Sequence, residues 1–374
     1  MRLRKKQQQF IDKASTEGLG FGAMFWKRFK RNVMAMISLC VIIVFTIIAL
    51  LGYLITPDHT PHCNQQYLEL ASLKPFSKAT FVYIDNGNSV SQGPLRTLAK
   101  GKPLGAETIP VYSYDTVGDN LRYETVTGSV PNDGEIHAVP LSRVKKIERR
   151  HFILGTDTYG RDVLSQIMIG SRVSLSVGFI AVAIALLIGI LLGSLSAYYG
   201  KWVDSLIMWL INVVWSIPTV LLVIAITFAL GKGFWQVFIA VGLTMWVDVA
   251  RVVRGQVLSV KEKEYIEAAR ALGYSTPRII IRHILPNIIG PVIVITASNF
   301  ASAILLEAGL SFLGIGVQPP MPSWGSMVKE NYAQILLDNA HLAFIPGLAI
   351  MIIVLAFMIV GNGIRDALDI RNQQ

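Results

Sequence analysis

Long stretches without a charged residue constrain this chain more than any other feature of its sequence. A helix needs about 20 consecutive, mostly apolar residues to cross the hydrocarbon core of a bilayer. Six uncharged stretches approach or exceed that length: 32–56, 173–200, 205–231, 233–247, the segment between Arg282 and Glu307, and the segment between His341 and Arg365. The fourth is the shortest and needs polar residues at its end to span. We therefore expect an all-α integral membrane protein with six transmembrane helices.

The first stretch, 32–56, predicts a retained anchor helix. Its apolar run exceeds the about 7–15 residues of a cleaved signal peptide, and no small-x-small cleavage pattern follows it directly. Charged residues make up 16% of the chain, against about 25% in soluble domains, which argues against a soluble fold. Cys40 lies inside this run and Cys63 lies outside it, so we expect no disulfide.

The positive charges predict how the helices are oriented, because Lys and Arg concentrate in cytoplasmic loops. Segment 1–31 carries nine of them, and the loop between the fourth and fifth stretches carries seven. Alternation from a cytoplasmic N-terminus places that loop and the C-terminus on the same side of the membrane. These basic segments account for the net charge of +10, so we expect no nucleic-acid partner.

The segment after the first stretch is long and, by this alternation, extracytoplasmic. Gly, Asn, Asp, Ser and Pro interrupt short alternating runs such as Thr80-Phe81-Val82-Tyr83-Ile84. Alternation of this kind is typical of β-strands. We expect an insertion here that contains β-structure.

Motifs for catalysis and nucleotide binding are missing from the sequence. Gly231-Lys232 is not followed by Ser or Thr, so there is no phosphate-binding loop, and no H-E-x-x-H zinc motif occurs. His59, His62 and Cys63 lack a standard metal-ligand spacing and indicate an irregular polar loop. We expect no enzyme activity, no metal site and no cofactor bound by this chain.

Ionisable residues are scarce inside the spans, which disfavours an ion-coupled secondary transporter. Asp248 and Glu307 are the nearest candidates, and both lie at the ends of spans. Asp157 and Asp162 flank Arg161 just before the second stretch. We expect Arg161 to pair with one of them structurally rather than the two carboxylates to act in catalysis.

The loop between the fourth and fifth stretches contains the most informative segment. Tyr265, Ala268, Ala269 and Leu272 follow one another at i, i+3, i+4 and i+7, which places them on one face of a short helix. This face is small and flat, so it favours docking of a partner protein over insertion into lipid. Gly273 can end the helix in a left-handed conformation.

A second helix is expected to follow directly. Thr276 is the expected cap, Pro277 occupies the first helical position, and Pro286 lies at the start of the fifth span. The two helices together predict a helix–turn–helix elbow at the cytoplasmic face of the membrane.

One string in this elbow resembles a known family. Glu267-Ala268-Ala269-x-x-x-Gly273, with Leu285-Pro286 downstream, is similar to the EAA motif of permease subunits of bacterial ABC importers. His283 departs from that motif, because the family usually has Ile there. Further similar strings occur in the family's order across about residues 150–370: 154–162, 250–256, 310–316 and Trp324-Gly325. The set resembles the C-type permease of dipeptide and oligopeptide importers, a branch that also includes nickel permeases.

The resemblance implies a machine of several chains in the bacterial inner membrane, with both termini of this chain in the cytoplasm. This chain would pair with a second homologous permease, and two ABC ATPase subunits or domains would bind ATP and Mg. An extracytoplasmic substrate-binding protein would deliver a di- or oligopeptide to the pathway between the permeases. The residues that the resemblance assigns to ATPase coupling are Tyr265, Glu267, Ala268, Ala269, Leu272, Gly273 and Pro286.

The expected layout is a basic segment 1–31, a transmembrane helix 32–56, an extracytoplasmic insertion 57–150 and a permease domain 151–370 that contains the coupling loop 251–286. The insertion is longer than expected for the family, and the resemblance does not cover its role. A second set of residues belongs to an outer gate or a docking surface for the binding protein, or else only braces the end of a helix: Gly155, Asp157, Gly160, Arg161, Asp162 and Trp324. Two alternatives stay open, which are a permease for nickel or another small solute, and a membrane channel or scaffold that binds a cytosolic regulator.

Overall fold

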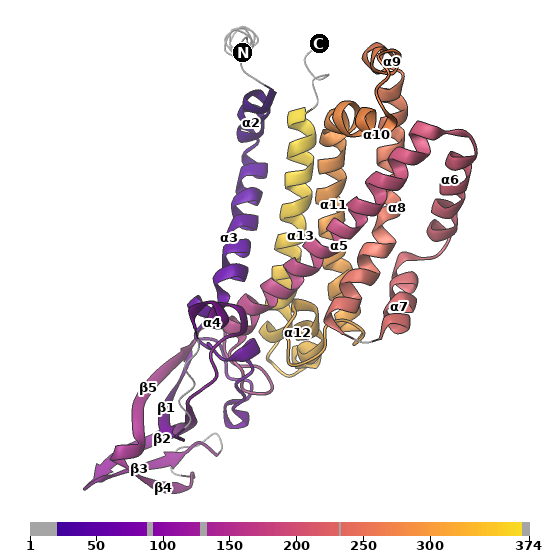
Figure 1. The fold of residues 1–374 in the computed structure, drawn as a ribbon. Coiled ribbons are helices and arrows are strands. Elements are labelled where there is room, and N and C mark those ends of the chain that lie inside the picture. The colour runs from indigo at the N-terminus through magenta and orange to yellow at the C-terminus, as the bar shows by residue number, and fades with distance from the viewer. Residues whose placement is uncertain (1–20, 88–92, 128–132, 232, 369–374) are drawn as a thin grey trace, which may run out of the picture.

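The computed structural model describes residues 21–87, 93–127, 133–231 and 233–368. Figure 1 shows a bundle of long helices and a small β-sheet that projects from one end of it. The opposite end of the bundle carries α2 (Phe21–Arg31), α9 (Glu264–Ala271) and α10 (Thr276–Ile279). We refer to the two ends as the sheet end and the elbow end.

Five described helices are long and apolar enough to cross a membrane. They are α3 (Val33–Ile55), α5 (Val163–Tyr199), α8 (Phe234–Lys261), α11 (Leu285–Phe312, continuous with the turns from Thr276) and α13 (His341–Leu368). A sixth span requires α6 (Lys201–Trp215) and α7 (Thr219–Leu230) together, because a bend of 92° separates them. Figure 1 shows α6 and α7 one after the other along the bundle, between the elbow end of α5 and the sheet end of α8. The helical spans expected from the sequence are therefore present, one of them broken.

The break corrects the prediction of a single uninterrupted stretch at 205–231. It falls between Trp215 and Thr219, and Pro218 is the residue that precedes α7. Proline has no backbone N–H and disfavours a helical conformation in the residue before it. Pro218 therefore ends the first helix and allows the second to start in another direction.

The helix α5 is longer than the uncharged stretch 173–200 that predicted it. α5 begins at Val163 and contains Arg172 within its first turns. The Arg172 guanidinium donates to the carbonyl oxygens of Leu98 and Ala99, each at 3.0 Å, at the end of α4 (Pro94–Lys100). These two carbonyl oxygens accept hydrogen bonds from the Arg172 guanidinium, so the helix can continue past this charged residue.

α5 and α8 pack closely because small residues lie between them. A Cβ on Gly193 would come within 2.5 Å of the Ala250 carbonyl oxygen, and a Cβ on Gly189 would come within 2.5 Å of the Val249 Cβ. Only glycine permits this approach, as is typical of helix interfaces in membranes. The pair forms the centre of the bundle, against which the elbow is built.

The insertion folds as a five-stranded antiparallel sheet with the strand order β4-β3-β2-β1-β5. The strands are β1 (Ser77–Asp85), β2 (Ala106–Val117), β3 (Asn120–Thr125), β4 (Ile136–Pro140) and β5 (Val144–Phe152). Phe81 and Tyr83 of β1 join one buried apolar cluster, whereas Val82 and Ile84 join another. The expected β-structure at 80–84 is confirmed, and both faces of β1 are covered.

The remaining described elements are short connectors: α12 (Trp324–Asn331), the 3-10 turns η1 (Pro61–Cys63), η2 (Leu68–Leu70), η3 (Leu141–Arg143) and η5 (Tyr332–Leu336), and the π-helical turn η4 (Ile280–Ile284). η1 and η2 connect α3 to the sheet, and α12 lies at the sheet end of the bundle (Figure 1).

Candidate functional site

α9 is a short helix that joins α8 to α10 at the elbow end (Figure 1). Ile266 is fully buried and Ala269 is nearly so, and both belong to one apolar cluster with Val257 of α8 and Ile279 of α10. These contacts hold one face of α9 against the bundle.

A second face of α9 is open. Tyr265 is 45% exposed, Leu272 is 73% exposed, and Ala268 between them is exposed as well. Glu267 beside them is also exposed. Because Ala268 carries only a methyl group, another surface can come close to the helix backbone at this point. We call Tyr265, Ala268 and Leu272 the open face of α9.

Ala269 was expected on this open face, and that expectation is wrong. Its exposed fraction is 4%, and it lies on the bundle side with Ile266. The prediction overlooked Ile266, which precedes Ala269 by three residues and therefore shares its side of the helix. The bulkier apolar side chain takes the buried position, and Ala269 follows it.

Gly273 ends α9 in the left-handed conformation, with φ of +76°. The Tyr274 amide donates to the Ala269 carbonyl at 3.1 Å, and the Gly273 amide donates to the Arg270 carbonyl at 2.9 Å. This pair of bonds is the Schellman motif, which satisfies the last carbonyls of a helix. The predicted role of Gly273 as a helix terminator is confirmed.

The second helix starts one residue earlier than expected. Ser275 is the N-cap of α10, and Thr276 and Pro277 are its first two residues, so the prediction of Thr276 as the cap is wrong. Ser275 has an extended backbone, as a cap requires, but its side chain makes no capping bond. Pro286 is the second residue of α11 and follows the π-helical turn η4 directly.

The turn between the two helices is held by a stack of side chains. The Tyr274 ring stacks on the His283 ring with centroids 5.8 Å apart, and the Arg278 guanidinium lies 4.8 Å from the Tyr274 centroid. His283 is the position that departs from the family motif. Here it packs η4 against Tyr274, the residue that follows Gly273, so the departure has a structural role.

Polar contacts tie the elbow to the neighbouring spans. The Lys261 ammonium donates to the Ala197 carbonyl at 2.7 Å, and Asp204 of α6 accepts two bonds from the Arg254 guanidinium at 2.7 and 2.6 Å. The Arg270 guanidinium lies 5.2 Å from the Tyr198 ring centroid at the end of α5. The elbow is therefore bonded to α5 and, through α8, to α6.

At the sheet end, residues 155–162 form a tight turn before α5. One Asp157 oxygen accepts from the amides of Tyr159 and Arg161, both at 2.9 Å, and the other lies 2.6 Å from the Arg161 Nε. The Arg161 guanidinium also pairs with Glu330 of α12. Burial lowers the pKa of Arg161, but Asp157 and Glu330 outweigh this effect, so its pKa is raised overall. The expected structural ion pair of Arg161 is confirmed, with Asp157 as the partner.

Two glycines make this turn possible. Gly155 and Gly160 have φ of +78° and +73°, a region that disfavours other residues. A Cβ on Gly160 would lie 1.7 Å from the Tyr67 carbonyl oxygen, and a Cβ on Gly155 would lie 2.2 Å from the Leu73 carbonyl oxygen. The turn is thus pressed against the chain that connects α3 to the sheet.

Asp162 caps α5. Its Oδ2 accepts from the Ser165 amide at 2.8 Å and from the Ser165 hydroxyl at 2.5 Å, while its Oδ1 has no hydrogen-bond partner among the described residues. Burial raises the pKa of Asp162, the two bonds from Ser165 oppose this rise, and the nearby Asp58 carboxylate adds to it.

Trp324 begins α12 and is fully buried. Its indole Nε1 donates to the Ile167 carbonyl of α5 at 3.0 Å, and its ring meets the Phe45 ring of α3 edge to face. Trp324 therefore joins three elements at the sheet end. Asp157, Arg161, Asp162 and Trp324 are all buried, so the second predicted set lies inside the protein rather than on an open surface.

The cluster at His59, His62 and Cys63 forms part of the link between α3 and the sheet. His59 Nδ1 lies 2.8 Å from the Tyr53 carbonyl oxygen, and the Cys63 thiol donates to the Asp58 carbonyl at 3.0 Å. Burial raises the pKa of the Cys63 thiol. Within the part of the chain that the structure describes, no group of three or more His, Cys, Asp or Glu residues could hold a metal ion.

Two family models match the chain. The model described as the binding-protein-dependent transport system inner membrane component matches residues 185–374, and the model described as the N-terminal TM domain of oligopeptide transport permease C matches residues 20–75. The first range contains the elbow, and the sheet lies between the two ranges.

Individual proteins are also similar to parts of this chain. The dipeptide transport system permease protein DppC of Alkalihalophilus pseudofirmus is 42% identical over 230 residues, which cover 62% of this chain and 75% of that protein. The oligopeptide transport system permease protein OppC of Bacillus subtilis is 39% identical over 215 residues, covering 58% and 70%. A solved inward-facing structure of the MetNI methionine ABC transporter covers 55% of this chain and 97% of its own, with a TM-score of 0.46 and 18% identity.

Proposed function

Because this chain belongs to the family of binding-protein-dependent transport system inner membrane components, we propose that it is a permease subunit of an ATP-driven importer of di- or oligopeptides. A second, homologous permease would complete the pathway, and an extracytoplasmic binding protein would deliver the peptide. ATP and Mg would bind to two partner ATPase subunits or domains, and this chain would hydrolyse nothing itself.

The peptide cargo is supported by the relatives. Permeases of dipeptide and oligopeptide transport systems are 42% and 39% identical to this chain over 230 and 215 residues. No comparable similarity supports the two alternatives, a permease for a small solute and a channel. Peptide uptake is therefore the activity to assay first.

The distribution of charge supports a cytoplasmic elbow. α2 ends with Arg28, Lys30 and Arg31, and the loop from Lys261 to Arg282 is also basic. Both lie at the elbow end (Figure 1). Positive charge near short loops marks the cytoplasmic side of a membrane protein, so the sheet end would face the binding protein in the inner membrane of a bacterium.

The single observation that carries the coupling role is the open face of α9. Apolar Tyr265 and Leu272 project from a helix whose other side is fixed to the bundle by Ile266 and Ala269. Glu267 and Ala268 lie beside them. A groove on an ATPase could cover this face, because helix-in-groove docking uses apolar anchors spaced along one side of a short helix.

A force on α9 would reach the spans through fixed contacts. The Schellman turn at Gly273 sets the angle between α9 and α10, and Pro286 starts α11 directly after η4. The pairs Lys261–Ala197 and Arg254–Asp204 connect the same region to α5 and α6. A partner that binds differently in two states can therefore bias the arrangement of the spans.

The second predicted set would brace the outer rim. The Asp157–Arg161–Glu330 network, in which Asp157 and Arg161 are buried, joins the turn before α5 to α12, and Trp324 joins α12 to α5 and α3. This burial supports a role in holding the outer ends of the spans together, rather than direct contact with a binding protein.

The coupling role can be tested with Ala268→Glu in the complex assembled from the native partner subunits. The added side chain would stand between α9 and a close-fitting partner, so the ATPase should no longer co-purify and peptide uptake into proteoliposomes should be lost. The level of the chain in the membrane should stay the same, because Ala268 contacts no buried cluster of the bundle.

Ala138→Glu provides a matched control. Ala138 is an exposed alanine on β4, at the end of the molecule far from the elbow (Figure 1). The control should retain the ATPase. Normal ATPase association in Ala268→Glu would contradict the proposed docking face, and a purified complex without any ATPase in the unmodified chain would contradict the importer itself.

A further inference from the structure

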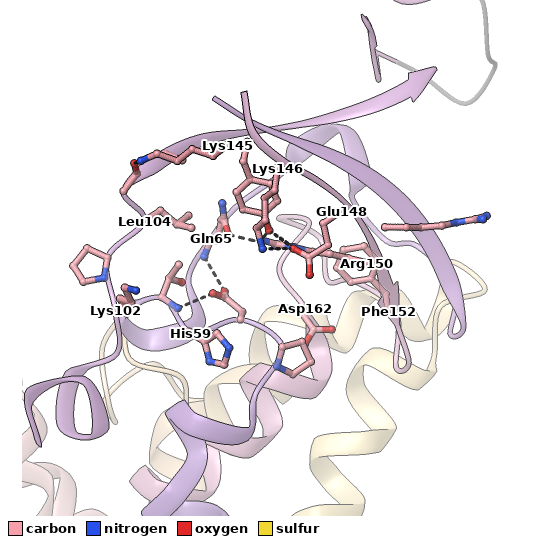
Figure 2. Close-up of a pocket in the computed structure, with 18 of the residues that line it drawn as sticks. His59, Gln65, Lys102, Leu104, Lys145, Lys146, Glu148, Arg150, Phe152 and Asp162 are labelled. Carbon is pink, nitrogen blue, oxygen red and sulfur yellow. Dashed lines mark hydrogen bonds and ion pairs between the residues drawn. The ribbon is translucent and has the colours of Figure 1, made fainter. Parts of the chain in front are cut away.

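A cavity of about 850 Å³ lies between the sheet and the sheet ends of α3 and α5 (Figure 2). Its lining comes from the segment after α3, the loop before β2, strand β5 and the cap of α5. Ligand pockets in proteins commonly measure about 300–1,000 Å³, so the cavity can hold a molecule the size of a short peptide.

Two buried carboxylates lie on the membrane side of this cavity. Asp58 and Asp162 are 6% and 7% exposed. The Asp58 carboxylate accepts from the Thr60 amide at 2.8 Å and from the Gln65 amide at 3.5 Å, and the Asp162 Oδ1 has no partner. Among the described residues neither carboxylate forms an ion pair with Lys, Arg or His.

Buried carboxylates without a cation are unfavourable, because burial removes the water that would stabilise their charge. The Thr60 hydroxyl oxygen in the same wall likewise has no hydrogen-bond partner within the described ranges. The membrane side of the cavity thus holds carboxylates that accept hydrogen bonds from amides and a hydroxyl but form no ion pair with a cation of the described residues. Because no metal-binding group of three ligands occurs in the described part of the chain, an ammonium group fits this site better than a metal ion.

Arg150 supplies the opposite charge on the sheet side of the cavity. Its guanidinium donates to the Tyr83 hydroxyl, with Nε at 3.0 Å, and lies 4.7 Å from the Phe81 ring centroid, but no carboxylate pairs with it in the part of the chain that the structure describes. Figure 2 shows Arg150 and Gln65 in the middle of the lining, with Asp162 below them. The guanidinium retains N–H groups for a carboxylate ligand.

The other cations of the cavity divide into paired and unpaired groups. Lys145 pairs with Asp85 at 2.9 Å, and Lys146 pairs with Glu148 at 2.7 Å. Lys102 lines the cavity beside His59 and forms no ion pair among the residues described. Arg150 and Lys102 thus form no close ion pair with an anion of the described residues, and Asp58 and Asp162, which Arg150 attracts only at longer range, form none with a cation.

We propose that this cavity binds a short peptide with free termini, holding its ammonium group at Asp162 and Asp58 and its carboxylate at Arg150 and Lys102. The requirement for both charges in one ligand comes from the cavity, and the choice of a peptide as that ligand rests on the proposed function. The cavity would hold peptide next to the outer ends of the spans, apart from the pathway between the two permeases.

The test uses the full chain in nanodiscs of phosphatidylcholine, which has no primary ammonium group. Titration calorimetry would compare Ala-Ala with its N-acetylated and C-amidated forms. The free dipeptide should bind, and each blocked form should bind roughly tenfold or more weakly, because each lacks one charge-assisted contact. Asp162→Asn should weaken the free dipeptide by a similar factor and leave the acetylated form unchanged. Lys102→Gln should weaken the free dipeptide and leave the amidated form unchanged.

Asp162→Asn is a suitable variant because Asn caps a helix as well as Asp does, so α5 should keep its start. Asp115→Asn is the matched control, since Asp115 is an exposed carboxylate on β2 of the same sheet and does not line the cavity. The control should bind dipeptide like the unmodified chain. Unfolding of Asp162→Asn would show as a loss of its melting transition, and Asp58→Asn would then provide the same comparison.

Three outcomes would overturn the proposal. Equal binding of the free and acetylated dipeptides would make this an anion site. If the chain loses dipeptide binding when its nanodiscs are made of phosphatidylethanolamine instead of phosphatidylcholine, the cavity is a lipid headgroup site. Uptake of dipeptide by the assembled transporter, with no binding to the cavity, would refute the proposal while the proposed function stands; binding without uptake would support the cavity and count against the transport function.

Discussion

Replacing Gly273 with valine should uncouple the elbow while leaving the chain in the membrane. Gly273 has φ of +76°, and no atom lies within 4 Å of the position that a Cβ would occupy. A clash with neighbours therefore contributes nothing, and the whole effect comes from the backbone. Holding a β-branched residue in this region costs about 1–3 kcal/mol.

The chain could avoid this strain only by changing the turn. That change would give up the Tyr274–Ala269 and Gly273–Arg270 backbone bonds, each worth about 0.5–1.5 kcal/mol. Either route costs about 1–3 kcal/mol, which reduces the population of the native elbow relative to other angles by roughly 5- to 150-fold. The angle between α9 and α10 would then vary, and a push on α9 would not reach α11.

The assay is peptide uptake by proteoliposomes that contain the assembled transporter, with ATP hydrolysis and membrane levels measured in parallel. Gly273→Val should lose most uptake while ATP hydrolysis continues. Gly273→Asn should retain more, because Asn tolerates the left-handed conformation better. Gly22→Val is the control, since Gly22 lies in α2, also has an open Cβ position and has no positive φ. Uptake by Gly273→Val equal to that of Gly22→Val would refute the argument.

Three further predictions concern the sheet end. Trp324→Ala should lower the unfolding free energy of the chain in detergent by about 3–5 kcal/mol, because Trp324 is fully buried. The control is Trp202→Ala, which should change the melting temperature little because Trp202 is 71% exposed. Arg161→Gln should lower the unfolding free energy by about 3–5 kcal/mol, because it leaves the Asp157 carboxylate buried and unpaired. The double variant Arg161→Gln/Asp157→Asn should recover part of this loss. Equal melting temperatures of the single and double variants would contradict this reasoning. The pKa of Asp162 is raised in the folded state. Between the ordinary Asp pKa and this raised value, the folded state therefore binds more protons than the unfolded state. The contribution of Asp162 to the unfolding free energy should consequently fall as pH rises through that window. Melting curves of the chain and of Asp162→Asn across this range should converge at low pH and separate as pH rises, and parallel curves would refute the assignment.

The two ends of the molecule differ in how they use their polar residues. At the elbow end the polar contacts bind α8 to α5 and α6 and leave the open face of α9 free of them. At the sheet end they are buried in the turn before α5 and around the cavity. A partner at the elbow end would therefore meet apolar side chains on a rigid helix, whereas a ligand at the sheet end would meet charges in a recess.

From the sequence alone, the long apolar segments and the first of the five strands could be located. The thickness of a bilayer sets the length of an apolar helix, so the run 32–56 predicted α3 without any knowledge of its neighbours. Alternation at 80–84 predicted β1 for a similar local reason. Gly273 was predicted to end α9, because only its own backbone conformation was needed.

The sequence left open how these segments meet. It could not show that Ile266 would take the bundle side of α9 and turn Ala269 inward, since that depends on the surface presented by α8 and α10. The sequence placed Asp162 at the outer ends of the spans but could not show that it lines a cavity. Asp58 and Ser165 lie on either side of Asp162 in the fold, and a hydrogen bond of 3.0 Å joins them although they are 107 positions apart in the chain. Local rules of length, period and backbone conformation act within a few residues, whereas burial and charge pairing depend on contacts between distant segments. Those contacts exist only once the tertiary structure has formed, and they alone decided which face of the elbow is open and which charges remain unpaired.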